Sequence, residues 1–321
     1  MTVPYLLRLI CLCLAAFFLI HLAAGLGVAR LAPSAVRLAL RMRASRASTF
    51  LLLLRLLPPA FALVVVAGFC APSYLWLEPP ATSEEVGWGC LAAAAFGAVV
   101  SAAALIGAVR ALWSLRQWRG NAREVSIGGG YGPIFIVGGS APFLALAGVV
   151  RPRLVATRCV MDTLTSEELL AAIRHERAHQ ASRDNLKRLL LLLAPDLLPA
   201  WPGLLAIEHA WARFAEWAAD DRAAAGDPHY SVSLAAALVR FARMGNAPVS
   251  SPLVTSLLAD TCDLSQRVDR LLECRPRPDA GGWFAVAWPF CTSLAVIGVA
   301  YLIRQPAALY WVHETLERLV H

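Results

Sequence analysis

The segment His175-Glu176-Arg177-Ala178-His179 places two histidines four residues apart, with a glutamate directly after the first. On a helix, residues i and i+4 lie on one face, so both imidazoles can reach a single metal ion. Zinc binds histidine nitrogen at about 2.0–2.1 Å, and the glutamate beside it can take a proton from a water molecule. The motif predicts one catalytic zinc ion held by His175 and His179, with Glu176 as the general base.

A third ligand is needed, because catalytic zinc sites have three protein ligands and one open position. Glu216 and Asp220 form an acidic pair at i and i+4 on the next clear helix, expected at about 205–225. We expect Glu216 to bind the metal and Asp220 to accept a hydrogen bond from the far nitrogen of a ligand histidine. The alternative is a solvated acidic face, since Glu208 and Asp221 are close in the sequence.

Other polar residues near the motif have less specific signals. Asp184 is expected to cap the following helix or to pair with an arginine. His209, His229 and Tyr230 are candidates for stabilising an oxyanion, but a structural role is the simpler interpretation of each, and the sequence does not choose between them. Arg177, inside the motif, is expected to point away from the metal.

Several elements must position these residues. Thr165 and Glu168 form a capping box that starts a helix running from 166 to about 180. Upstream, three β-type segments at 124–127, 134–137 and 153–156 are separated by glycine and proline, which predicts a short twisted sheet. Downstream, the apolar stretch 189–207 contains three prolines, which predicts a broken hairpin rather than a span.

Composition indicates a membrane protein, because 58% of the 321 residues are apolar and only 16% are charged. Four apolar runs are long enough to cross a bilayer. The predicted organisation is three transmembrane helices within 1–113, a peptidase segment at 114–281, a fourth transmembrane helix at 282–303 and a short external tail at 304–321. Cys70 and Cys90 flank one short loop, so a disulfide between them is an open alternative.

The basic residues predict the orientation. The connection after the first run carries five arginines and no acid, and further arginines follow the third run, whereas the second connection is acidic. We therefore expect the first connection and the peptidase segment to be cytoplasmic, and both termini external, in a multi-pass protein of the inner (plasma) membrane. The net charge of +7 is concentrated beside apolar runs, so no direct binding of nucleic acid is expected.

The motif and the downstream acidic pair, lying between the third and fourth apolar runs, resemble the BlaR/MecR-type membrane metallopeptidases. Segments 141–148, 151–155, 179–185 and 266–272 are similar to further stretches of that family. The resemblance implies an α-helical integral membrane protein with an inserted α+β zincin-like (gluzincin) peptidase domain and an active-site edge strand, expected near 151–156. That family's best-known receptors carry an external penicillin-binding sensor, for which 304–321 is too short.

The expected function is zinc-dependent endopeptidase activity, with a protein or peptide as substrate. The resemblance adds regulatory cleavage of a cytoplasmic target such as a transcriptional repressor. Two alternatives stay open: an HtpX-like peptidase for quality control of membrane proteins, and a non-enzymatic receptor or scaffold. The sequence gives no oligomeric state.

Overall fold

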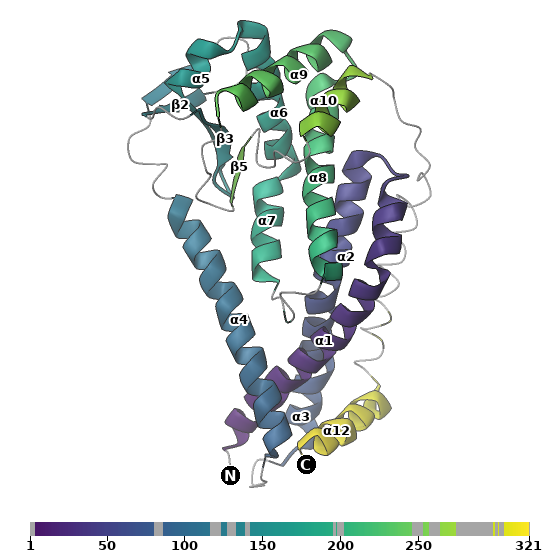
Figure 1. Ribbon diagram of the computed structural model, residues 1–321. Helices are drawn as coiled ribbons and strands as arrows, with labels where there is room; N and C mark the ends of the chain where they lie inside the picture. Colours follow the sequence, from purple (N-terminus) through teal and green to yellow (C-terminus); the bar gives the residue numbers. More distant parts are fainter. Residues whose placement is uncertain are drawn as a thin grey trace.

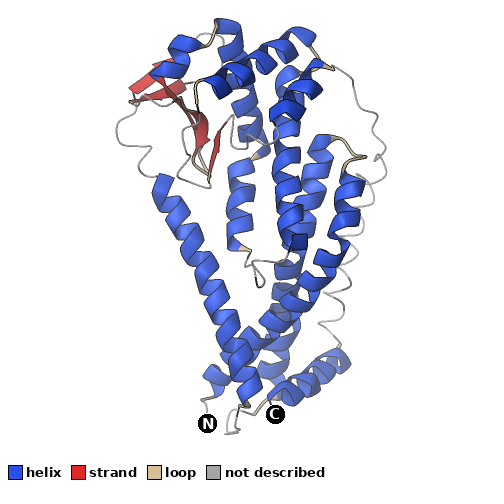
Figure 2. Ribbon diagram, viewed as in Figure 1, coloured by secondary structure: helices blue, strands red, loops and turns tan. Residues whose placement is uncertain are grey.

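The structure, a computed structural model, is mostly helical, with a small sheet at one end (Figure 1; Figure 2). Helices form the lower part in the view of Figure 1, and the sheet with its covering helices forms the upper part. The described residues are 4–79, 86–115, 123–126, 133–138, 142–194, 197, 202–245, 253–256, 264–273, 298, 301 and 305–320.

Three helical segments are long and apolar enough to cross a membrane. They are α1 (Tyr5–Ala39), the segment Ala44–Leu77 and α4 (Trp88–Ser114). The middle segment consists of α2 (Ala44–Val65), a π-helical turn η1 (Val66–Cys70) and α3 (Ala71–Leu77). At 1.5 Å per residue each exceeds the roughly 30 Å of a bilayer core. Three of the four predicted runs are therefore long helices, compatible with a membrane protein.

The fourth predicted run, 282–303, lies outside the described residues apart from Gly298 and Tyr301. The predicted tail is helical over α12 (Pro306–Val320). This helix lies at the same end of the molecule as the start of α1, and the sheet lies at the other end (Figure 1). The hydroxyl of Ser73 in α3 donates to the carbonyl of Leu309 at 2.9 Å, which fixes α12 against the end of the bundle.

The sheet has five strands in the order β1-β2-β4-β3-β5. Their bounds are β1 Arg123–Ser126, β2 Pro133–Val137, β3 Leu144–Ala147, β4 Arg153–Thr157 and β5 Val254–Ser256. The three predicted strands are present as β1, β2 and β4. The expectation of an edge strand near 151–156 is wrong, because β4 pairs in parallel with β2 on one side and antiparallel with β3 on the other. Within the described residues, β5 ends the sheet on the side of α6 and α7.

Four helices complete the upper part: α5 (Arg158–Thr163), α6 (Ser166–Ser182), α9 (Pro228–Arg243) and α10 (Leu264–Leu272). Leu144 and Leu154 of the sheet, Ile173 of α6, and Leu234 and Leu238 of α9 are fully buried in their shared core. At about 25 cal/mol per Å² of apolar surface, such burial is the main force that holds α6 on the sheet.

The predicted broken hairpin is α7 (Asp184–Leu193) followed by α8 (Pro202–Ala224). Its packing joins the two parts of the molecule, because Trp211 and Phe214 of α8 share a buried cluster with residues of α1 and α2. A Cβ at Gly203 would lie 2.4 Å from the carbonyl oxygen of Ala29, so only glycine permits this approach of α8 to α1. Arg55 of α2 also lies 3.6 Å from Glu208 of α8.

Cys70 and Cys90 are both free and buried in the structure. The disulfide left open by the sequence is therefore not formed here.

Candidate metal centre

Helix α6 carries the motif, and its start is fixed locally. The Thr165 hydroxyl accepts from the Glu168 amide, and the Glu168 carboxylate accepts from the Thr165 amide, so the predicted capping box is confirmed. Glu168 also accepts from Arg240 at 3.1 Å, which ties the first turn of α6 to α9. With the start of α6 fixed in this way, His175 and His179 lie on the inner face of the helix, and each is at most 1% exposed.

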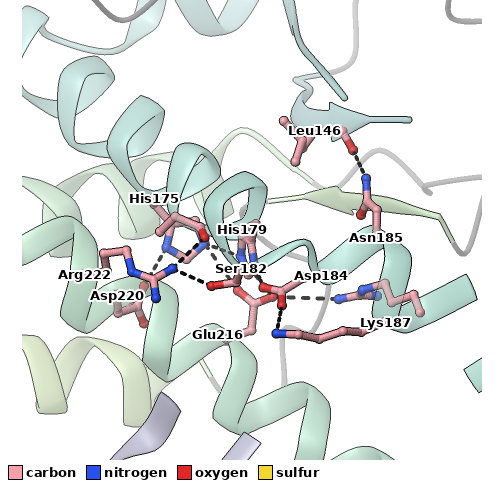
Figure 3. A network of polar contacts seen from close by, with 12 residues as sticks. Leu146, His175, His179, Ser182, Asp184, Asn185, Lys187, Glu216, Asp220 and Arg222 are labelled. Carbon is pink, nitrogen blue, oxygen red and sulfur yellow. Dashed lines mark hydrogen bonds and ion pairs between the residues drawn. The ribbon is translucent and has the colours of Figure 1, made fainter. Parts of the chain in front are cut away.

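The side chains of His175, His179 and Glu216 converge, the histidines from α6 and the glutamate from α8 (Figure 3). The two Nε2 atoms are 3.1 Å apart. Glu216 places Oε2 at 3.4 Å from His175 Nε2 and Oε1 at 3.6 Å from His179 Nε2. Four ligands at 2.0–2.2 Å from zinc in a tetrahedron are about 3.3–3.6 Å from each other. The two separations from Glu216 match the edges of a tetrahedral zinc site, and the separation of the two Nε2 atoms is slightly shorter.

A carboxylate lies beside the far nitrogen of each histidine (Figure 3). His175 Nδ1 lies 2.9 Å from Asp220 Oδ1, and His179 Nδ1 lies 2.7 Å from Asp184 Oδ2. Carboxylates in this position fix the tautomer of a histidine ligand and keep its Nε2 toward the metal. Asp220 thus occupies the place expected for it.

Asp184 has a different position from the one expected. Helix α7 has no side-chain cap, and the predicted pairing of Asp184 with an arginine is wrong, because its partners are His179 and Lys187. The reason is Arg183, which adopts a left-handed conformation (φ 53°) between α6 and α7 and turns the chain so that Asp184 faces back to His179. Asn185 then donates to the carbonyls of Leu146 and Gly148, which anchors this corner to β3.

Arg267 of α10 is a further residue of the site that the sequence did not single out. It is 2% exposed and donates to both oxygens of Asp220, at 2.9 and 2.8 Å. Its third nitrogen lies 3.2 Å from Glu216 Oε2. Arg267 thus contacts both acidic residues of α8. The amphipathic helix at 264–272 could have suggested a buried arginine, but nothing in the sequence named its partners.

Glu176 is fully buried, and neither of its carboxylate oxygens has a hydrogen-bond partner among the described residues. Burial raises the pKa of Glu176 to about 7, against the lowering effect of the two histidines. A group of this pKa can both accept and return a proton near neutral pH, which is what general acid–base catalysis requires.

Neighbouring opposite charges stabilise the charged forms of the buried site residues, against the effect of burial. Burial alone would raise the pKa of Glu216, but the charges of His179 and Arg267 lower it well below its usual range. Burial disfavours charge on His179 too, yet Glu216 and Asp184 raise its pKa to about 10. Both oxygens of Glu216 lack hydrogen-bond partners within the described part of the chain. A ligand set of two imidazoles and one carboxylate with such unsatisfied atoms fits a zinc ion.

A cavity of about 400 Å³ opens beside His179, between the β3–β4 connection and the junction of α6 and α7. Val150, in the connection, is 90% exposed, and Arg188 of α7 is 20% exposed with its guanidinium 4.0 Å from Glu216. The cavity is lined by Leu146, Val149, Val150, Pro152, His179, Gln180, Arg183, Asp184, Asn185 and Leu186. Of the three converging residues, His179 lines this cavity.

The other candidates contact different parts of the protein. His229 lies 3.4 Å from Glu167 in the first turn of α6, and Tyr230 packs under Arg174. His209 lies on α8 nearly two turns before Glu216 and is exposed. Arg177 donates to Gln180. No contact of these four residues with His175, His179 or Glu216 occurs among those described.

Comparison of the chain with protein-family models, with curated proteins and with solved structures gave no match.

Proposed function

We propose that the chain is a membrane-embedded zinc endopeptidase in which His175, His179 and Glu216 hold the metal and Glu176 is the general base. One observation carries the proposal: ligand atoms of three residues from two helices converge at separations of 3.1–3.6 Å, close to those of a zinc tetrahedron. They lie next to a buried carboxylate whose oxygens have no hydrogen-bond partners in the described structure. A zincin-like fold of the helices and sheet around the site is part of the same proposal.

The residues of the chain have separate tasks in this mechanism. When bound, zinc supplies a Lewis acid that polarises a carbonyl and acidifies water. Glu176 takes the proton of the attacking water and returns it to the leaving amine, for which a pKa of about 7 is well matched. Asp220 and Asp184 hold the two imidazoles in the tautomer that turns Nε2 inward, and Arg267 holds Asp220 and Glu216.

We propose an extended segment of a protein as the substrate. The cavity beside His179 is bordered by the β3–β4 connection, and the terminal strand β5 lies beside α6 and α7. A peptide can add to a free sheet edge through main-chain hydrogen bonds, and this mode selects flexible loops over folded bystanders. With β4 central in the sheet, β5 takes the role of the edge strand in this proposal.

The biological role proposed is site-limited cleavage of a cytoplasmic protein, with a transcriptional repressor as the target suggested by the BlaR/MecR-type resemblance. In this orientation the arginine-rich connection and the metal centre face the cytoplasm of a cell bounded by an inner (plasma) membrane, and α12 is external. The metal centre and α12 lie at opposite ends of the molecule (Figure 1).

The test compares the wild type with Glu176→Gln, a variant of equal shape that cannot accept a proton. We expect Glu176→Gln to bind one zinc at this site and to cleave no substrate, while Glu216→Ala loses the zinc. Zinc content is measured by elemental analysis, and substrates are sought by comparing the proteomes of cells that express each form. Accumulation of one or two regulators supports the role; a broad rise in misfolded membrane proteins favours quality control; undiminished cleavage removes Glu176 from the mechanism.

A further inference from the structure

A second cluster of possible metal ligands lies at the opposite end of the bundle from the metal centre. It consists of Glu78, directly after α3, with His313 and Glu317 of α12. His313 Nε2 is 3.6 Å from Glu78 Oε2 and 3.3 Å from Glu317 Oε1. All three ligand atoms lie within 4.8 Å of each other. The cluster repeats the arrangement of the first site: an i, i+4 pair on one helix and a carboxylate from a distant segment.

The distances distinguish this cluster from a hydrogen-bonded ion pair. Both separations from His313 Nε2 exceed the 2.7–3.2 Å of a normal N–H···O hydrogen bond. A single N–H at Nε2 also points in one direction and cannot serve two carboxylates fully. The same two separations fall on the roughly 3.3–3.6 Å edge expected for ligands around zinc.

Glu78 is held as ligand carboxylates commonly are. Its Oε1 pairs with Arg8, a residue only 2% exposed, while Oε2 faces His313. Arg8 is itself oriented by the Tyr74 hydroxyl at 2.8 Å. An outer contact of this kind fixes the direction of a ligand carboxylate, and the buried positive charge offsets one of the two negative charges. The cluster therefore has a built inner side, formed by α1 and α3, and an outer side contributed by α12.

We infer that Glu78, His313 and Glu317 form a second site, for a divalent first-row metal cation of the zinc class. Imidazole with two carboxylates suits Zn²⁺ and its neighbours, whereas Mg²⁺ and Ca²⁺ prefer all-oxygen sites. The side chain of Glu317 is 55% exposed and that of His313 16%, so the cation exchanges with solvent. When bound, it joins α12 to the end of α3. The inference does not depend on the proposed peptidase activity.

The test uses the full-length chain in detergent with His175→Ala/His179→Ala, which removes the first site. In equilibrium dialysis against ZnCl₂, this variant should retain about one zinc per chain. Adding His313→Ala should weaken the remaining binding by more than about 100-fold, since loss of even an outer partner of a metal ligand costs about 10–100-fold. Glu314→Gln is the matched control, because Glu314 lies on the same helix, is 62% exposed and pairs with Arg318; it should change nothing.

The inference is overturned if the double variant binds no zinc, or if His313→Ala leaves its binding unchanged. Loss of binding through displacement of α12 is tested separately by His313→Cys, which keeps a ligand atom at that position. With Co²⁺, this variant should gain a thiolate-to-cobalt charge-transfer band over the baseline of the eight native cysteines, and Glu314→Cys should not. Equal spectra for the two cysteine variants would refute the site. Failure of the first site alone appears differently, as equal zinc content in the wild type and the double variant.

Discussion

Replacement of Arg267 by methionine tests whether the buried charges of the metal centre depend on this one residue. The change keeps an unbranched apolar stem but removes the guanidinium, and with it two charge-assisted hydrogen bonds to Asp220, at 2.9 and 2.8 Å, and the 3.2 Å contact with Glu216. Hydrogen bonds to charged groups contribute about 1.5–3 kcal/mol each, which gives about 3–6 kcal/mol. Removing one partner of a buried ion pair costs about 3–5 kcal/mol, which agrees with this sum of the two hydrogen bonds.

The assay is thermal unfolding in detergent, followed by the fluorescence of the ten tryptophans. For a chain of this size 1 kcal/mol corresponds to about 2 °C, so Arg267→Met should lower the Tm by about 6–10 °C. The matched control is Arg270→Met, one turn along α10, because Arg270 pairs with Asp221, whose side chain is 52% exposed. A partly exposed pair of this kind contributes about 0–1 kcal/mol, so the control should shift the Tm by 2 °C at most.

A second variant identifies why Arg267→Met loses thermal stability. If the cost comes from the carboxylate left without its cation, Arg267→Met/Asp220→Asn should unfold at a higher temperature than Arg267→Met alone. The reasoning is refuted if Arg267→Met behaves like the Arg270→Met control, or if the added Asp220→Asn lowers the Tm further.

Three further predictions follow from the geometry. Asp184→Asn and Asp220→Asn should each lower zinc affinity about 10–100-fold, measured by competition with a chelating dye, and unchanged affinity would remove these residues from the support of the histidines. Gly203→Ala should cost about 1–3 kcal/mol in thermal unfolding because its Cβ would lie 2.4 Å from the Ala29 carbonyl, whereas Gly107→Ala, with nothing within 4 Å, should cost none. Reporter fusions at Arg43 and near Gly245 should be cytoplasmic and those at Glu84 and after His321 external; a cytoplasmic C-terminus would contradict the four-span arrangement.

Local sequence patterns were sufficient to predict those features that depend on a single helix. Thr165 and Glu168 are three residues apart and form the capping box by themselves. His175 and His179 share a face of α6 because the helix has 3.6 residues per turn, and the same period places Glu216 and Asp220 together on α8. The long apolar helices were equally visible, since length and hydropathy define them.

Tertiary contacts decided the rest. The partners of Asp184 depend on the left-handed conformation of Arg183. Arginine rarely adopts this conformation, so the residue type at this position does not predict it. The position of Arg267 depends on how α10 packs over α8, 47 residues away from Asp220 along the chain. The central place of β4 depends on β3, whose short segment Leu144–Ala147 is apolar at every position and lacks the alternation by which strands are recognised.

The packing of α8 has a consequence for how the candidate site assembles. Its first half is buried against α1 and α2, and its second half supplies Glu216 and Asp220. The nascent chain therefore cannot bring Glu216 to His175 and His179 until the N-terminal helices have assembled as a bundle. The candidate site thus depends on the packing of the long apolar helices, which lie far from it in the sequence. A chain whose N-terminal helices fail to pack is therefore expected to lack the convergence of these three side chains.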